Sequence, residues 1–134
     1  MPPVEGAEWL LLEGSDATAI TRDRWSLVVF FRPHLEPCHR EAPGVMEVFD
    51  RFGPKGLTVV GVTPDGREAA REFIQRHGIR FPVLANGGHL MKAYGTGTLW
   101  ENRTYLLNPS GVVVVQDDLP EIQRVLRRRV GGED

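Results

Sequence analysis

The feature that most constrains the fold is a pair of continuous apolar runs separated by a stretch with helical periodicity. The runs are Ser26–Phe31 (SLVVFF) and Leu57–Thr63 (LTVVGVT), and both are rich in β-branched and aromatic residues. A strand that is apolar on both faces belongs in the middle of a sheet with helices on either side. Two such strands joined by a helix form a βαβ unit. We therefore expect Phe30 and Val60 to lie on adjacent parallel strands.

The segment between the two runs carries one apolar stripe. Its spacings of four, three, four and three keep the side chains on one helix face; the residues are Cys38, Ala42, Val45, Phe49 and Phe52. A second helix is expected at about Asp65–His77. A last helix starts near Asp118, with Glu121 three residues on as in a capping box.

Shorter elements complete the pattern. We expect a strand at Trp9–Leu12, a short edge segment at Phe81–Leu84 and a helical turn at Leu90–Tyr94. Two further strands, Thr104–Leu107 and Val112–Val115, are joined by Asn-Pro-Ser-Gly. Asn, Pro and Gly occupy the first, second and fourth positions that a type I turn prefers, which predicts an antiparallel hairpin.

Length and charge narrow the class of protein. A chain of 134 residues suits a single domain, residues 1–134. A net charge of −2, from 16 Lys and Arg against 18 Asp and Glu, gives no reason to expect nucleic acid or an anionic membrane as partner. No stretch reaches the roughly 18 apolar residues of a membrane span. Residues 1–6 (MPPVEG) lack the basic and apolar regions of a signal peptide. We expect a cytoplasmic protein.

The segment 30–43 (FFRPHLEPCHREAP) lies where a central strand gives way to a helix, the place where open α/β sheets carry their active sites. It resembles the thioredoxin-like thiol reductases of the TlpA/ResA group and the neighbouring AhpC/TSA (peroxiredoxin) superfamily. Those reductases carry an apolar strand and then F-W-x-x-W-C-x-P-C-x-x-E-x-P. The residues that match without a gap are Phe30, Pro37, Cys38, Glu41 and Pro43.

The resemblance continues downstream and covers roughly residues 9–125. The further matching segments are Gly56 to Val62, Phe81-Pro82-Val83, Tyr94-Gly95, and the hairpin from Arg103 to Gly111. This order of motifs implies an α/β thioredoxin fold. Its central mixed sheet joins a parallel βαβ half to an antiparallel ββ hairpin, and helices cover both faces.

Two departures from the reductases bear on function. Leu35 stands where those reductases have their attacking cysteine. A C-x-x-C site uses one thiolate to attack a disulfide and a second thiol to resolve the mixed disulfide. With one cysteine in the chain, that cycle cannot run within it. Asn102 also stands where the family places a cis-proline beside the active site, when the alignment is taken back from Gly111.

The resemblance to peroxiredoxins implies that Cys38 itself is the nucleophile. Those enzymes have a cysteine at the first turn of the same helix, and they hold its thiolate with an arginine from a later strand. Arg103 is the candidate for that arginine. A helix N-terminus and a nearby arginine both favour a thiolate. We predict Cys38, Glu41 as a proton shuttle, and Arg103 as catalytic residues. The predicted substrate-binding residues are His34, Leu35, Pro37, Trp100 and Asn102.

Two alternatives stay open at this point. Cys38 lies on an apolar stripe, and free cysteine is among the most buried residue types. The sequence therefore fits a buried structural cysteine as well as it fits a reactive thiol. The His34, Cys38, His39 cluster has three potential ligands and no fourth, which falls short of a structural zinc site. We expect no metal and no cofactor.

The hypothesis is therefore an antioxidant redox protein that uses the single thiol of Cys38 as a thiol-dependent oxidoreductase or a peroxidase-like enzyme. Its partner would be a small-molecule peroxide or a protein disulfide or thiol. The alternative is a catalytically silent thioredoxin-fold binding module.

Overall fold

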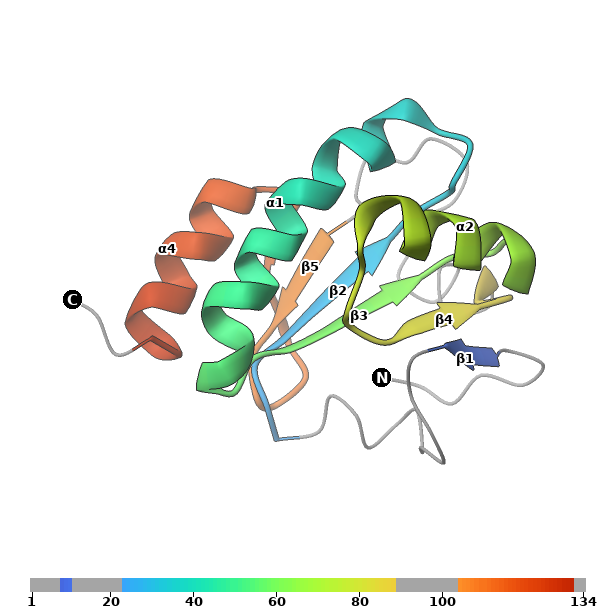
Figure 1. Cartoon of the computed structure of the whole chain (residues 1–134). Helices are drawn as coiled ribbons and strands as arrows, with labels where there is room; N and C mark the ends of the chain where they lie inside the picture. The colour runs from blue at the N-terminus through green and yellow to red at the C-terminus, as the bar shows by residue number, and fades with distance from the viewer. Residues whose placement is uncertain (1–7, 11–22, 89–103, 132–134) are drawn as a thin grey trace.

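One mixed sheet organises the residues that the computed structural model describes, which are 8–10, 23–88 and 104–131 (Figure 1). Its strand order is β1-β4-β3-β2-β5-β6. In chain order the elements are β1 (Glu8–Leu10), β2 (Ser26–Phe30), α1 (Glu36–Phe52), a 3₁₀ turn (Gly53–Lys55), β3 (Thr58–Val62), α2 (Arg67–His77), β4 (Val83–Ala85), β5 (Thr104–Leu107), β6 (Val113–Gln116) and α4 (Leu119–Arg129).

The centre of the sheet is the predicted βαβ unit. Strands β2 and β3 are parallel, with Val28 opposite Val60 and Phe30 opposite Val62. Every residue of β2 is buried, as expected for a run that is apolar on both faces. The prediction that Phe30 and Val60 lie on adjacent parallel strands is confirmed.

The antiparallel half is the hairpin of β5 and β6. The Gly111 N–H donates to the Asn108 carbonyl at 2.8 Å and closes the turn. The Asn108 side-chain oxygen accepts from the N–H groups of Ser110 and Val112. Gly111 has φ of 82°, a left-handed conformation that favours glycine. The Asn-Pro-Ser-Gly tetrapeptide therefore predicted both the position of the turn and the antiparallel hairpin that it closes.

Strand β4 corrects one expectation. The Phe81–Leu84 segment was expected at the sheet edge, whereas Val83–Ala85 forms an interior strand. It pairs in parallel with β3 on one side and antiparallel with β1 on the other. The pairing with β1 joins distant parts of the chain, so no local pattern reveals it.

Helices α1, α2 and α4 lie on the same face of the sheet (Figure 1). For the described residues, the expectation that helices cover both faces therefore holds on this face alone. Their buried side chains form one cluster with Leu27, Val29 and Val59 of the sheet; the helix members are Cys38, Ala42, Val45, Val48, Phe52, Ala70, Phe73, Ile74, Ile122 and Leu126. Val48 is buried in α1, and the expected Phe49 beside it is partly buried and packs against the same cluster. The helical turn expected at Leu90–Tyr94 lies outside the described residues.

The opposite face of the sheet carries a second buried cluster. Its members are Val28, Phe30, Val60, Val62, Leu84, Tyr105 and Leu107. Phe30 and Tyr105 meet edge to face, with ring centroids 5.6 Å apart. In the three described ranges, no helix is long and apolar enough to cross a membrane.

Candidate thiol site at the start of helix α1

The candidate site is built by the short connection from β2 to α1. Leu35 is the N-cap of α1 and has an extended backbone, and two prolines and several polar residues surround it. The Leu35 N–H donates to the Arg32 carbonyl at 3.0 Å, and the Cys38 N–H donates to the Leu35 carbonyl at 3.2 Å. Pro37 in the first turn supplies a φ that suits a helix start. These features place Cys38 in the first turn of α1.

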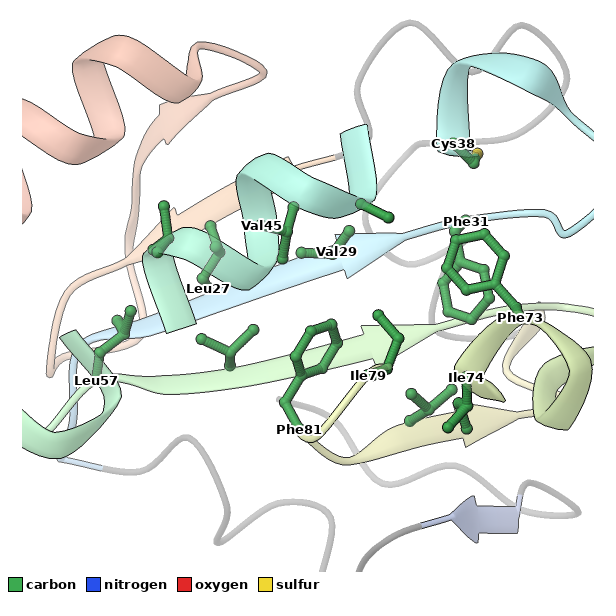
Figure 2. Packing of buried hydrophobic residues seen from close by; sticks show 14 of the residues in the cluster. Leu27, Val29, Phe31, Cys38, Val45, Leu57, Phe73, Ile74, Ile79 and Phe81 are labelled. Atoms are coloured by element: carbon green, nitrogen blue, oxygen red, sulfur yellow. The ribbon is translucent and has the colours of Figure 1, made fainter. Parts of the chain in front are cut away.

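The Cys38 side chain points toward the sheet and is only 3% exposed. Its Sγ accepts the Arg32 N–H at 3.4 Å. Figure 2 shows Cys38 beside Phe31 and Phe73, which stack on each other with ring centroids 4.3 Å apart. These side chains line a cavity of about 20 Å³, and Glu41 lines it as well. A volume of that size holds about one water-sized molecule.

The electrostatic influences on the thiol oppose one another. The N-terminus of α1 and the Arg32 N–H both stabilise an anionic sulfur. Burial disfavours the charged form, and the carboxylate of Glu36 in the first turn adds a like charge. These influences act in opposite directions, and the burial of the Cys38 side chain restricts access to its sulfur.

A pair of histidines lies against the same connection. His39 Nδ1 is 2.7 Å from His77 Nε2, and His39 Nε2 is 2.6 Å from the Pro33 carbonyl oxygen. Both rings pack on Phe73, at centroid distances of 5.1 Å for His39 and 4.6 Å for His77. Burial, with contributions from the charges of His39 and Arg76, lowers the pKa of His77 below its ordinary value of 6.5.

The structure brings together some of the predicted site residues. Cys38 and Glu41 line one cavity. Leu35 is half-buried and packs against both hydrophobic clusters. His34 is exposed, with its Nδ1 3.8 Å from Asp65 Oδ2, and Pro37 is exposed at the helix start. The remaining three residues lie outside the described residues: Trp100, Asn102 and Arg103.

The His34, Cys38, His39 cluster does not assemble as a metal site. Both ring nitrogens of His39 are within hydrogen-bond distance of protein atoms, and His34 faces Asp65. Among the described residues, no three His, Cys, Asp or Glu side chains are grouped so that they could hold a metal ion.

Sequence reasoning missed two contributors to the site. One is the Arg32 backbone N–H, which no side-chain motif marks. The other is His77, which the sequence marks only as the end of the helix expected at about Asp65–His77; the helix does end there, before Gly78 with a left-handed φ of 63°. His77 lies four residues after Phe73 and so shares its helix face, a spacing that could have placed it toward α1.

The mixed sheet, with a thiol in the first turn of the helix that follows a central parallel strand, defines a thioredoxin-like protein. Solved structures agree. The thioredoxin domain of a thiol-disulfide oxidoreductase from Bacteroides vulgatus superposes with a TM-score of 0.71 at 19% identity, covering 82% of this chain and 81% of that one. StoA from Bacillus subtilis superposes with a TM-score of 0.66 at 20% identity, covering 92% and 98%.

This chain belongs to the AhpC/TSA family, whose profile matches residues 12–116. It is similar to the thiol-disulfide oxidoreductase ResA of Bacillus thuringiensis (strain Al Hakam), with 28% identity over 89 residues that cover 65% of this chain and 50% of that protein. It is also similar to the chloroplastic peroxiredoxin Q of Sedum lineare, with 30% identity over 95 residues that cover 65% and 51%. The chain thus spans about half the length of these relatives. The family resemblance drawn from the sequence is confirmed.

Proposed function

We propose that this chain is a redox protein that acts through one thiol, that of Cys38. The observation that carries the proposal is the placement of Cys38 Sγ at a helix N-terminus, with the Arg32 N–H 3.4 Å away and Glu41 on the same cavity. A helix N-terminus stabilises an anion by typically about 0.3–1 kcal/mol. Membership of the AhpC/TSA family, whose members use thiol chemistry, supports the same conclusion.

The proposed reaction is the reduction of a peroxide. The Cys38 thiolate attacks one peroxide oxygen, an S–O bond forms, and the O–O bond breaks. The sulfur is oxidised to sulfenic acid, and the leaving oxygen takes a proton and departs as water or an alcohol. Two equivalents of an external thiol then restore Cys38, releasing water and the disulfide of that thiol. The external thiol is required because the chain has one cysteine.

The size of the site favours a small oxidant. A cavity of about 20 Å³ beside a sulfur in a 3% exposed residue has no room for a peptide disulfide. A protein disulfide or thiol partner would reach Sγ only after the side chains that bury Cys38 move. Peroxide is therefore the preferred substrate class, and a protein thiol is the second.

The roles of the side chains follow from this chemistry. Cys38 is the nucleophile, and Glu41, on the cavity wall, is the group to receive and return the proton. His34, Leu35 and Pro37 belong to the segment immediately before Cys38, and their roles with substrate stay predictions from the sequence. The roles of Arg103 with the thiolate, and of Trp100 and Asn102 with substrate, stay predictions from the sequence.

A second candidate function is a catalytically silent binding module. The burial of Cys38 among core side chains favours it, because a buried structural cysteine is inert. In that case the thiol only fills space between α1 and the sheet.

Sulfenic acid trapping separates the two candidates. The native protein is treated with mild peroxide in the presence of a dimedone-type trap, and the adduct is measured by intact mass. We expect one adduct in the wild type, none in Cys38→Ser and slower formation in Glu41→Gln. Because the chain has one cysteine, the adduct needs no further assignment. A thiol that reacts no faster than free cysteine, or only after denaturation, establishes the silent module instead.

A further inference from the structure

The two histidines beside the thiol site define each other's protonation. The Pro33 carbonyl oxygen only accepts, so His39 Nε2, 2.6 Å away, carries a hydrogen. In a neutral His39 ring, Nδ1 then has a lone pair, and His77 Nε2 must donate to it across 2.7 Å. With one added proton the bond survives: either His77 is the cation and its Nε2–H still donates to His39 Nδ1, or His39 is the cation, its Nδ1–H donates to His77 Nε2, and His77 carries its own hydrogen on Nδ1. With two added protons both facing nitrogens carry hydrogens, so this bond is lost and two cations face each other across the former contact. His39 keeps its Nε2–H, and we expect the repulsion from His77 to move the His39 ring and with it the donor to the Pro33 carbonyl.

His39 connects this pair to the thiol through the backbone. It holds the Pro33 carbonyl, and the neighbouring Arg32 N–H is the donor to Cys38 Sγ. Leu35, at the other end of the 32–35 connection, accepts the Cys38 N–H. The same connection is therefore tied to Cys38 at both ends and to His39 in the middle. His77 anchors His39 from α2.

We propose that His39 and His77 are positioning residues that hold the 32–35 connection closed against Cys38 while the pair carries at most one proton, and release it when a second proton binds. The inference rests on the proposed function, because it explains how a buried thiol becomes available to an oxidant or a thiol partner.

The positive charges around the pair oppose the second proton, and the carboxylate beside it, that of Glu36, favours it. Arg76 lies next to His77 on α2, and Glu36 and Arg40 flank His39 on α1. On the connection itself, His34 faces Asp65 rather than the pair. The pKa of His77 is lowered by burial first and then by the charges of His39 and Arg76. Release therefore occurs below the ordinary histidine pKa of 6.5.

The test measures the exposure of Cys38 with 4,4′-dithiodipyridine, a thiol reagent that works at acidic pH. The rate is divided by the fraction of thiolate, measured separately by thiolate absorbance. From about pH 8 to about pH 5 the corrected rate of the wild type should rise by roughly fivefold, the effect of losing one hydrogen bond. His39→Leu, which loses the bond to Pro33, should show the raised rate at every pH.

His39→Gln is the matched conservative variant. Its amide Nε2 can still donate to the Pro33 carbonyl, but it cannot take a proton. We expect the wild-type rate near pH 8 and no rise on acidification. His34→Gln removes a different histidine of the same connection and should retain the pH step. A flat corrected rate in the wild type, or a His39→Leu rate equal to that of the wild type, overturns the proposal.

A second measurement does not depend on any variant folding. Long-range ¹H–¹⁵N NMR of the wild-type histidines near pH 8 should show Nε2–H tautomers for both His39 and His77. A Nδ1–H tautomer for His39 overturns the proposal. Both measurements are independent of peroxide chemistry. A positive pH step with no sulfenic acid would therefore reject the proposed function while the positioning role stands.

Discussion

Replacing Leu35 with cysteine would put a second thiol at the N-cap of α1, three residues before Cys38. The Cys38 N–H donates to the Leu35 carbonyl at 3.2 Å, which closes a turn whose end Cα atoms lie less than about 7 Å apart. A disulfide needs Cα atoms about 4.4–6.8 Å apart. We therefore expect Leu35→Cys to form a reversible disulfide with Cys38.

The stabilisation that this disulfide should give follows from the size of the loop that it closes. Residues 35–38 make a loop of four residues, for which the chain-entropy relation gives a stabilisation of about 2 kcal/mol at 25 °C. Unfolding entropy scales at about 2.1 cal/mol/K per residue, so for 134 residues this corresponds to a rise in Tm of roughly 7 °C. Comparing the oxidised and reduced forms of one variant cancels the lost packing of the leucine.

Two assays on the variant check this. Thermal unfolding followed by circular dichroism, with and without dithiothreitol, gives the difference in Tm. Leu35→Cys should turn over a disulfide substrate with dithiothreitol as donor. The wild type should show no turnover by a route that needs two cysteines. Leu35→Ser is the control, because serine is close to cysteine in size and has no thiol. Its Tm should be the same with and without dithiothreitol.

Two results would refute this reasoning. Failure of Leu35→Cys to form the disulfide would mean that residue 35 does not occupy the position of the attacking cysteine. Equal disulfide reductase activity in wild type and variant would mean that the lone thiol of Cys38 is already sufficient.

Three further predictions concern stability. Because the pKa of His77 is lowered in the folded state, the unfolded chain binds more protons below about pH 6.5, and the free energy of unfolding should fall as pH drops through that value. Urea denaturation of the wild type and of His77→Gln at two pH values measures this fall. An equal pH dependence in the two proteins contradicts the prediction. Leu126→Ala, at a fully buried position, should cost about 2–5 kcal/mol, against less than about 0.5 kcal/mol for the neighbouring exposed Arg127→Ala. Gly111→Ala should cost about 1–2 kcal/mol because of its positive φ, whereas Ser110→Ala should be nearly neutral, as measured by chemical denaturation.

Local sequence determined much of the fold. The β-branched runs predicted β2 and β3 and their parallel pairing, because such side chains fit a sheet covered by helices. The Asn-Pro-Ser-Gly tetrapeptide predicted the hairpin, and Asp118 predicted the start of α4, where its side chain accepts the Glu121 N–H at 3.1 Å. In each case the cause lies within a few residues of the effect.

The tertiary structure decided what the sequence left open at the site. The apolar stripe of α1 was consistent with a reactive or a buried Cys38, and the packing of α1 and α2 on one face of the sheet placed the side chain in the core. The interior position of β4 depends on β1, at the far end of the chain. His39 and His77 are 38 residues apart and meet only because two helices pack side by side. Periodicity reports which face of an element is buried, and it carries no information on which distant residue that face meets.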